Sequence, residues 1–211
     1  MGIKERKLKH RENLRQSILD AAKMLFLKNG YEATSIRKIA AEIEFSPTTI
    51  YLYYKDKAEI MHALHQEGFK MLSEQFKVLR NVSDPFERLK AMGRSYINFA
   101  LENRDFYEIM FIMKEPLQHI KEEEEPDWEE GDAAFQTLVS TVMECQEKGH
   151  FREYEPESFA LLAWSNMHGL CTLNNNGHLN LLCHKTGGSA NDASVAMQKS
   201  FDIYIDMLGK V

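Results

Sequence analysis

The sequence predicts an all-α protein, and three observations support this. Apolar residues recur three and four residues apart along most of the 211-residue chain, which is the spacing of one helix face. Only five prolines and eleven glycines interrupt it. No stretch shows the sustained alternation of a half-buried strand. The composition, 44% hydrophobic and 27% charged, is typical of a folding chain, and no apolar run approaches the roughly 20 residues of a membrane helix.

Two helices are expected in the first 43 residues. The first spans Asn13–Lys28 and stops at Gly30, since glycine favours the residue that follows a helix. The second is short and is capped by Thr34 or Ser35, whose hydroxyls can accept from free backbone N–H groups. The inward-facing residues of the two helices share a three- and four-residue spacing: Leu14, Ile18, Ala21, Ala22, Leu25 and Phe26, then Ile36, Ile39, Ala40 and Ile43.

A third short helix is predicted over Pro47–Tyr54. Ser46 provides the cap, and Pro47 suits the first helical position because its missing N–H has no partner to lose there. Ile50 is its inward residue. So short a helix needs Ile50 buried against the two preceding helices, and the opposite face is then free to enter a DNA major groove, as in a helix-turn-helix.

The rest of the chain continues the helical pattern. Asp56 caps a helix over Lys57–Leu79, Asp84-Pro85 opens the next, and a short apolar segment covers Phe106–Met113. The prolines, the glycine and the glutamates of Lys114–Asp132 predict an exposed acidic loop, with a functional acidic patch over 121–132 as the alternative. Three further helices are expected at Ala133–Lys148, Pro156 to about Asn175, and Ala190–Leu208.

Charge is divided unevenly along the chain. Residues 1–60 carry 12 Lys and Arg against 8 Asp and Glu, whereas residues 61–211 carry 14 against 24. A basic first quarter on an acidic body suits a protein whose N-terminal end meets a polyanion, although solvated lysine-rich helices are also common. Three widely spaced cysteines and the lack of a visible secretory signal lead us to expect a protein of the reducing cytoplasm.

Residues 11–62 resemble the DNA-binding domain of the tetracycline-repressor (TetR) family of bacterial regulators. The similarity rests on the first-helix stripe ending in Phe26, on Gly30-Tyr31, and on the runs Thr34 to Ala40 and Thr49 to Lys57, the latter with its Tyr-x-Tyr-aromatic-Lys-x-Lys spacing. The resemblance implies a homodimer that binds a palindromic double-stranded operator, usually represses, and is released when a small molecule enters its C-terminal domain.

The same resemblance implies which residues contact DNA. On the second and third helices and in the first turn of the fourth they are Ser35, Arg37, Pro47, Thr48, Thr49, Tyr51, Tyr53 and Lys57. Hydroxyls can bond phosphates or base edges, and Lys57 matches the lysine with which the family binds phosphate. Glu44 departs from the family's usual turn glycine, at a cost of roughly 1 kcal/mol if a positive φ is needed there. Pro47 and Thr48 also depart, so the operator sequence does not transfer.

A second resemblance covers the C-terminal part. Trp164, His168 and Gly169 match the Trp-x3-His-Gly signature of one TetR C-terminal subclass. Structural packing is the alternative role for this signature and for the methionines near Phe106. A family-type pocket for a small apolar or amphipathic ligand is expected to use Tyr96, Phe99, Tyr107, Met110, Trp164, Met167 and His168.

The expected organisation is a helix-turn-helix domain over residues 1–60 and a larger ligand-binding and dimerisation domain over residues 61–211. Dimerisation is expected on the last two long helices, forming a four-helix bundle with the partner. The face predicted for the last helix consists of Val195, Met197, Phe201, Tyr204 and Leu208.

Other classes of function find little support. Cys171, His178, Cys183 and His184 are the only local set of metal-binding side chains, and their spacing, in an expected loop, matches no closed zinc pattern. No phosphate loop, nucleophile elbow or metalloprotease motif is present, so neither an enzyme nor a cofactor or metal is expected. Two alternatives stay open: a protein of this fold without an inducer, acting through a protein partner or as a structural DNA binder, and a sensor of lipids or fatty-acyl chains.

Overall fold

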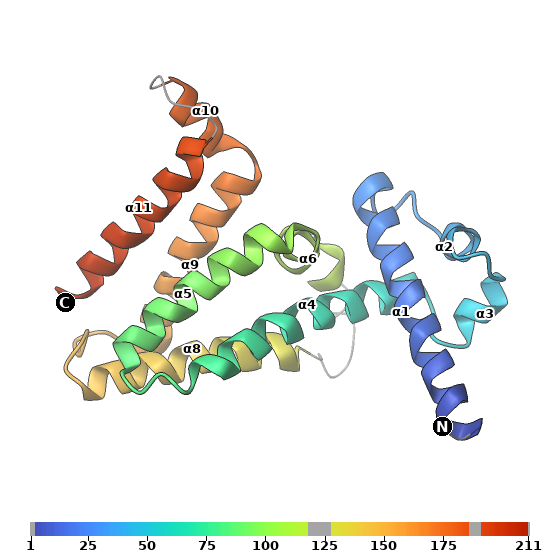
Figure 1. Cartoon of the computed structure of the whole chain (residues 1–211), viewed down its shortest axis with the longest axis horizontal. Coiled ribbons are helices and arrows are strands. Elements are labelled where there is room, and N and C mark those ends of the chain that lie inside the picture. The colour runs from blue at the N-terminus through green and yellow to red at the C-terminus, as the bar shows by residue number, and fades with distance from the viewer. Residues whose placement is uncertain (1–2, 118–127, 186–190, 211) are drawn as a thin grey trace. The chain divides into compact units, whose positions relative to one another are not determined.

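The computed structural model describes residues 3–117, 128–185 and 191–210. Over these residues the chain is helical and contains no strand (Figure 1), as the sequence predicted. The elements are α1 (Ile3–Asn29), α2 (Ile36–Glu42), α3 (Pro47–Tyr51), α4 (Lys57–Leu79), α5 (Pro85–Glu102), α6 (Arg104–Tyr107), the π-helix η1 (Glu108–Ile112), α8 (Glu129–Glu147), α9 (Pro156–Asn175), α10 (His178–Lys185) and α11 (Asn191–Leu208).

Packing divides the chain into two compact units. The N-terminal unit consists of residues 1–69 and 105–128, and the C-terminal unit consists of residues 70–104 and 129–211. Helix α4 contributes residues to both. The domain boundary expected between residues 60 and 61 stays a prediction, because packing alone does not show which segment folds independently.

In the N-terminal unit, helices α1 to α4 all contribute core residues that are almost wholly buried. Helices α2 and α3 each contribute a fully buried isoleucine, Ile39 and Ile50. Ile18, Ala22 and Phe26 of α1 and Ile60 and Leu64 of α4 are likewise at most 1% exposed. Because α3 has only five residues, its place depends on Ile50, as its length predicted.

Local hydrogen bonds define the ends of the short helices. Ser35 caps α2 by accepting from the Lys38 N–H at 3.3 Å, and Ser46 caps α3 by accepting from the Thr49 N–H at 3.2 Å. Thr34, the other candidate cap, is buried and donates to backbone carbonyls of α1 and of Gly30. Glu44 has φ 58°, so the turn between α2 and α3 does place glutamate where glycine is favoured.

Two boundaries in this unit differ from the sequence prediction. Helix α1 begins at Ile3 instead of Asn13, because the lysines, arginines and glutamates before Asn13 are good helix formers that carry no apolar stripe. Helix α3 ends at Tyr51 instead of Tyr54, since the chain turns there and buries the Tyr54 ring to 2% exposure. The apolar segment Phe106–Met113 was also simpler in prediction than in the structure, where α6 passes directly into η1.

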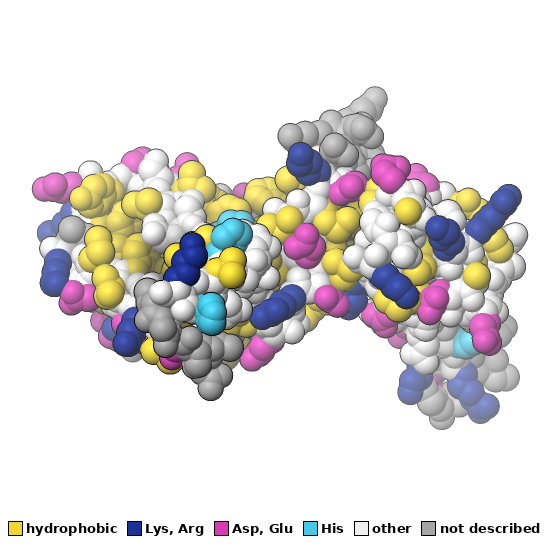
Figure 2. All heavy atoms as spheres, turned by 90° about the horizontal axis from the view of Figure 1, so that it is seen from above, with side chains coloured by type: hydrophobic (Ala, Val, Ile, Leu, Met, Phe, Trp, Pro, Cys, Tyr) yellow, Lys and Arg dark blue, Asp and Glu magenta, His cyan; other side chains and the backbone are white. Residues whose placement is uncertain are grey.

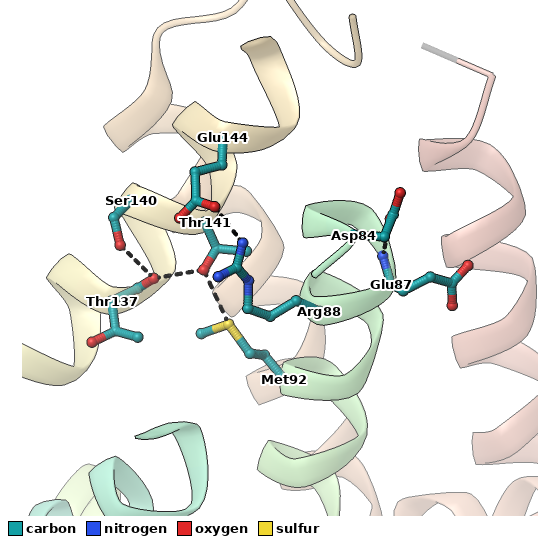
Figure 3. A network of polar contacts seen from close by, with 8 residues as sticks. All are labelled: Asp84, Glu87, Arg88, Met92, Thr137, Ser140, Thr141 and Glu144. Atoms are coloured by element: carbon teal, nitrogen blue, oxygen red, sulfur yellow. Dashed lines mark hydrogen bonds and ion pairs between the residues drawn. The ribbon is translucent and has the colours of Figure 1, made fainter. Parts of the chain in front are cut away.

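The C-terminal unit is built from long helices that share a broad core. Helices α5, α8 and α9 pack on one another, and α11 packs on α9 and α10. The core includes Leu89, Val139, Val142, Cys145, Phe151, Phe159, Ala160 and Leu208. Polar side chains also join α5 to α8: Arg88 forms an ion pair with Glu144, and the Thr141 hydroxyl lies 3.5 Å from the Met92 sulfur (Figure 3).

Predictions for the C-terminal unit were confirmed in part. Helices α5, α9 and α11 occupy the expected segments, with Asp84 capping α5 by accepting from the Glu87 N–H at 2.8 Å. Helix α8 begins at Glu129, so the last residues of the expected acidic loop are helical, while residues 118–127 lie outside the described part of the chain. The segment expected as a loop around Cys183 is helix α10.

The face predicted for dimerisation was wrong in most of its members. Met197, Phe201 and Leu208 are buried within their own unit, at 6% exposure or less, and Tyr204 is half-buried. Of the five, only Val195 is exposed. The helical spacing places the other four on one face, which packs inward, whereas Val195 lies on the opposite side of the helix. The large exposed hydrophobic residues of α9 and α11 are Leu161, Leu162, Leu173, Val195, Ile203 and Met207. Hydrophobic side chains gather at the left of the surface in Figure 2, over the C-terminal unit.

Candidate nucleic-acid interface

Helix α3 presents polar and aromatic side chains on the side opposite Ile50. Thr48 is exposed and Tyr51 is 56% exposed, whereas Pro47, Thr49 and Tyr53 are half-buried at the edges of the same surface. Ile50 itself is fully buried. The orientation expected from the sequence is therefore present, with every predicted residue of α3 and its following turn at least partly accessible.

The capping bonds decide which hydroxyls of α3 are available. The Ser46 and Thr49 hydroxyl oxygens lie 2.9 Å apart, so one donates to the other. This bond holds Thr49 against the helix start and leaves Thr48 and Tyr51 as the more accessible hydroxyls. Hydroxyls of this kind can bond phosphate oxygens or base edges, and a threonine methyl can pack against thymine.

Helix α2 adds two exposed residues, Ser35 and Arg37. The Ser35 oxygen accepts the capping bond from the Lys38 N–H, so its own proton remains available to donate to a phosphate. Lys38 lies beside them, and its ammonium donates to the Ala33 carbonyl at 2.6 Å.

Lys57 lies in the first turn of α4, as predicted, but its ammonium is already engaged. It donates to the Tyr31 carbonyl at 2.7 Å and lies 3.8 Å from the centre of the Tyr31 ring. An ammonium has three N–H donors, so two remain for a phosphate. The contact with Tyr31 holds the charge at the start of α4, where the helix dipole also favours an anion.

Two arginines at this surface were missed by the sequence analysis. The Arg11 guanidinium lies 5.9 Å from the centre of the Tyr53 ring. Arg15 donates through Nε to the Tyr54 hydroxyl at 3.1 Å, and its guanidinium lies 5.7 Å from the Tyr54 ring centre. Both arginines are exposed. The basic run before Asn13 is the sequence signal for these arginines. It lies outside the apolar stripe, so helical spacing alone does not place its side chains beside α3.

The seven residues expected to line a ligand pocket are divided between the two units. Tyr107 and Met110 belong to the N-terminal unit, where both are buried. The other five belong to the C-terminal unit. There Tyr96, Phe99 and Met167 are at most 5% exposed, and Trp164 and His168 are half-buried.

Three of these five residues form a hydrogen-bonded group. Trp164 Nε1 donates to the Tyr96 hydroxyl oxygen at 3.1 Å, and the same oxygen lies 3.0 Å from His168 Nδ1. Because the indole N–H can only donate, the Tyr96 oxygen accepts that bond, and the Tyr96 hydroxyl can donate its own proton to Nδ1. Burial lowers the pKa of His168, which favours the neutral imidazole that accepts this bond.

Among the described residues no group of three or more histidine, cysteine or acidic side chains is arranged to hold a metal ion. Cys171 is buried in α9, where burial raises its thiol pKa to about 12. Within the described helices, none combines the length and apolar composition that crossing a membrane requires.

Two family patterns match the chain. Residues 18–64 match the N-terminal domain of bacterial regulatory proteins of the TetR family, and residues 89–207 match a tetracycline-repressor-like C-terminal domain. The chain belongs to the TetR family. Members of this family are transcriptional regulators with a helix-turn-helix DNA-binding domain, and they are not enzymes.

Individual TetR-family relatives agree with this assignment. The chain is 22% identical over 102 residues to the transposon Tn10 TetC protein of Escherichia coli, covering 47% of this chain and 52% of that protein. It is 35% identical over 60 residues to a fatty acid metabolism regulator protein of Bacillus subtilis, covering 28% and 31%. The chain thus spans about half the length, or less, of these curated relatives.

A solved TetR-family structure shares the fold over most of the chain. The fatty acid degradation regulator FadR from Bacillus halodurans is similar with a TM-score of 0.70 and 18% identity, covering 90% of this chain and 94% of that one. At this level of identity the similarity establishes the fold alone.

Proposed function

We propose that this protein is a one-component regulator that binds a palindromic operator as a homodimer, represses transcription, and is released by a small molecule. A regulator of this kind works in the bacterial cytoplasm, where its DNA is. The observation that carries the proposal is the orientation of α3: Ile50 is fully buried, while Thr48 and Tyr51 face solvent. With Ser35, Arg37, Pro47, Thr49, Tyr53 and Lys57 these residues form the proposed DNA-binding surface.

Exposed apolar residues on α9 and α11 support the homodimer. Leu162 is 55% exposed, and Ile203 and Met207 are about equally so at 62% and 60%. Long helices with an apolar outer face commonly bury it in a four-helix bundle with a second copy. In the dimer the two copies of α3, the recognition helices, are expected to lie about 34–36 Å apart, which is one turn of DNA.

Release follows if a ligand binds better to a form with a different separation of these helices. Such a ligand shifts the population toward that form and lowers the affinity for the operator. By linkage, operator DNA lowers the affinity for the ligand by the same factor. The hydrogen-bonded group of Tyr96, Trp164 and His168, with buried Phe99 and Met167 in the same unit, supports a partly apolar ligand with one polar end. Two relatives are named for fatty acid metabolism or degradation, so fatty-acyl compounds are the first class to test.

Selection of bound duplexes from a random DNA library tests the DNA-binding proposal. We expect enrichment of an inverted repeat with half-site centres about 10 base pairs apart, or a multiple of that. Recovery of no enriched sequence, or of single unpaired half-sites, would contradict binding by a symmetric dimer.

Thermal unfolding with added ligand tests release. Decanoic acid and palmitoyl-CoA are suitable probes, and a ligand at 100 times its Kd should add about 2.7 kcal/mol to stability. The same compound should weaken operator binding, and Trp164→Phe, which removes the indole N–H, should reduce both effects. Stabilisation without any change in operator affinity would contradict an inducer.

One observation favours a second function without an inducer. Phe99 is fully buried, and a Cβ added to Gly93 would lie 2.8 Å from the Phe201 ring, so this part of the C-terminal unit is closely packed. A solid unit of this kind suits a DNA-binding protein that is controlled by a protein partner. Operator binding that no small molecule in a broad library alters would support this alternative.

A further inference from the structure

The net positive charge of the N-terminal quarter comes entirely from its first 15 residues. These carry six Lys and Arg against two acidic residues, whereas residues 16–60 carry six of each sign. The segment that contains α2, α3 and the start of α4 is therefore neutral overall. Non-specific attraction to DNA depends on such charge, because each cation that neutralises a phosphate releases a bound counterion.

This basic segment is an ordered extension of α1. The helix begins at Ile3, whereas the match to the family's DNA-binding pattern begins only at residue 18. In Figure 1 the first turns of α1 extend beyond α2 and α3. Positions 4, 7, 11 and 15 are all basic and follow the three- and four-residue spacing of one helix face.

Contacts with the tyrosines that follow α3 orient this basic face of α1. Arg11 lies over the Tyr53 ring and Arg15 is bonded to the Tyr54 hydroxyl, and both tyrosines directly follow α3. Arg15 uses only Nε–H in this bond. Its two terminal nitrogens can therefore form a bidentate hydrogen bond with a phosphate. Both side chains are exposed. These contacts place both arginines next to the end of α3.

We infer that the face of α1 that carries Arg11 and Arg15 is a second DNA-binding element. It binds the sugar-phosphate backbone beside the groove that α3 enters. This rests on the proposed function. A lipid surface fits less well, because Leu8 is the one large exposed hydrophobic residue among the side chains described before Leu14, and an interfacial helix needs an apolar face.

The salt dependence of binding tests this inference. The probe is the duplex recovered from the random library. Its binding is titrated by fluorescence anisotropy between about 50 and 300 mM KCl, a range in which counterion release changes the affinity strongly. The variant Arg11→Gln/Arg15→Gln should lower the slope of log K against log salt by about two per protomer and weaken binding at low salt. The matched control is Arg6→Gln/Lys9→Gln, which removes two exposed cations from the other side of the same helix and should leave the slope nearly unchanged.

The remaining outcomes separate the possibilities. Arg11→Lys/Arg15→Lys keeps the charges and should keep most of the slope. If the glutamine pair fails to fold, as judged by circular dichroism, Arg11→Gln alone makes the same test with an expected change of about one. Equal effects of the glutamine pair and its control, or no effect of either, would overturn the inference, as would loss of binding to phosphatidylserine vesicles with no change in the DNA slope. If the wild-type chain binds no duplex at all, the proposed function itself fails.

Discussion

The N-terminal and C-terminal units are held together in different ways. The N-terminal unit packs two short helices, α2 and α3, which are each anchored by one or two fully buried side chains such as Ile39 and Ile50. The C-terminal unit has helices of 18 to 20 residues, α5, α8, α9 and α11, that share a broad core. A short helix with few anchors should lose its structure locally when one is removed, whereas a broad core distributes the same loss.

Removing the anchor of α3 should give the largest effect. Ile50→Ala deletes a fully buried side chain, which should cost about 2–5 kcal/mol and release α3, so that operator binding is lost. Val142→Ala in the C-terminal unit, also fully buried, is the control and should lower stability while keeping DNA binding. Urea unfolding and anisotropy measure the two effects. Retained DNA binding by Ile50→Ala would show that α3 has support besides this residue.

Acid should act on the N-terminal unit through His65, which is 1% exposed on α4. Burial, and then the nearby His62, lower its pKa from 6.5 to about 4. The folded state therefore favours the neutral form. The free energy of unfolding is highest above about pH 6.5 and falls by about 3 kcal/mol as the pH drops toward 4, because the unfolded chain binds the proton first.

The variant His65→Leu should unfold with a shallower dependence on pH over this range, as followed by circular dichroism in urea. His10→Gln, at an exposed position of α1, is the control and should behave as the wild type. An unchanged pH profile for His65→Leu would show that other groups cause the acid sensitivity.

Close packing in the C-terminal unit predicts opposite effects at two glycines. A Cβ at Gly93 would lie 2.8 Å from the ring of Phe201, which is 1% exposed, whereas a Cβ at Gly169 would meet nothing within 4 Å. Gly93→Ala should therefore destabilise by about 1–3 kcal/mol despite the better helix propensity of alanine. Gly169→Ala should stabilise by up to about 1 kcal/mol. Thermal unfolding compares them, and equal signs would mean that Phe201 can move aside.

Two side chains of the DNA-binding surface should affect binding with little effect on folding. Tyr53→Ala and Lys57→Ala should each weaken operator binding about tenfold, equal to about 1.4 kcal/mol. Lys55→Ala, an exposed lysine beside them, is the control and should change affinity less. Wild-type affinity for both variants in mobility-shift titrations would remove these residues from the interface.

The turn between α2 and α3 should give the smallest effect and the only gain in the N-terminal unit. Glu44→Gly relieves a positive φ of 58° and should stabilise by roughly 1 kcal/mol. Glu42→Gly, in the last turn of α2, should instead destabilise by up to about 1 kcal/mol. Thermal unfolding distinguishes the two, and a loss of stability in Glu44→Gly would show that the carboxylate has a compensating contact.

Most of the fold was predictable because the signals are local. Ser46-Pro47 and Asp84-Pro85 marked helix starts that the structure confirms, since a cap depends on only the next three residues. Errors arose where a signal was short or silent. Helix α10 has only eight residues, and the first turns of α1 have charge without an apolar stripe.

The functional surface was predictable to a smaller extent. The outward position of Thr48 and Tyr51 followed from burying Ile50, but the contacts of Arg11 with Tyr53 and of Arg15 with Tyr54 join residues about 40 positions apart. No spacing rule connects such distant positions. The same limit explains the seven expected ligand-binding residues, of which Tyr107 and Met110 lie in a different unit from Tyr96.

The sequence by itself determined the helical class, most helix limits and the family, because caps, periodicity and the Tyr-x-Tyr run act over a few neighbouring residues. Only the tertiary structure decided which apolar face meets which neighbour. Phe201 and Met197 show this most clearly: their spacing defines a face of α11, but that face packs into its own unit. Burial depends on what lies opposite a face, and a helix's own sequence carries no record of its neighbour.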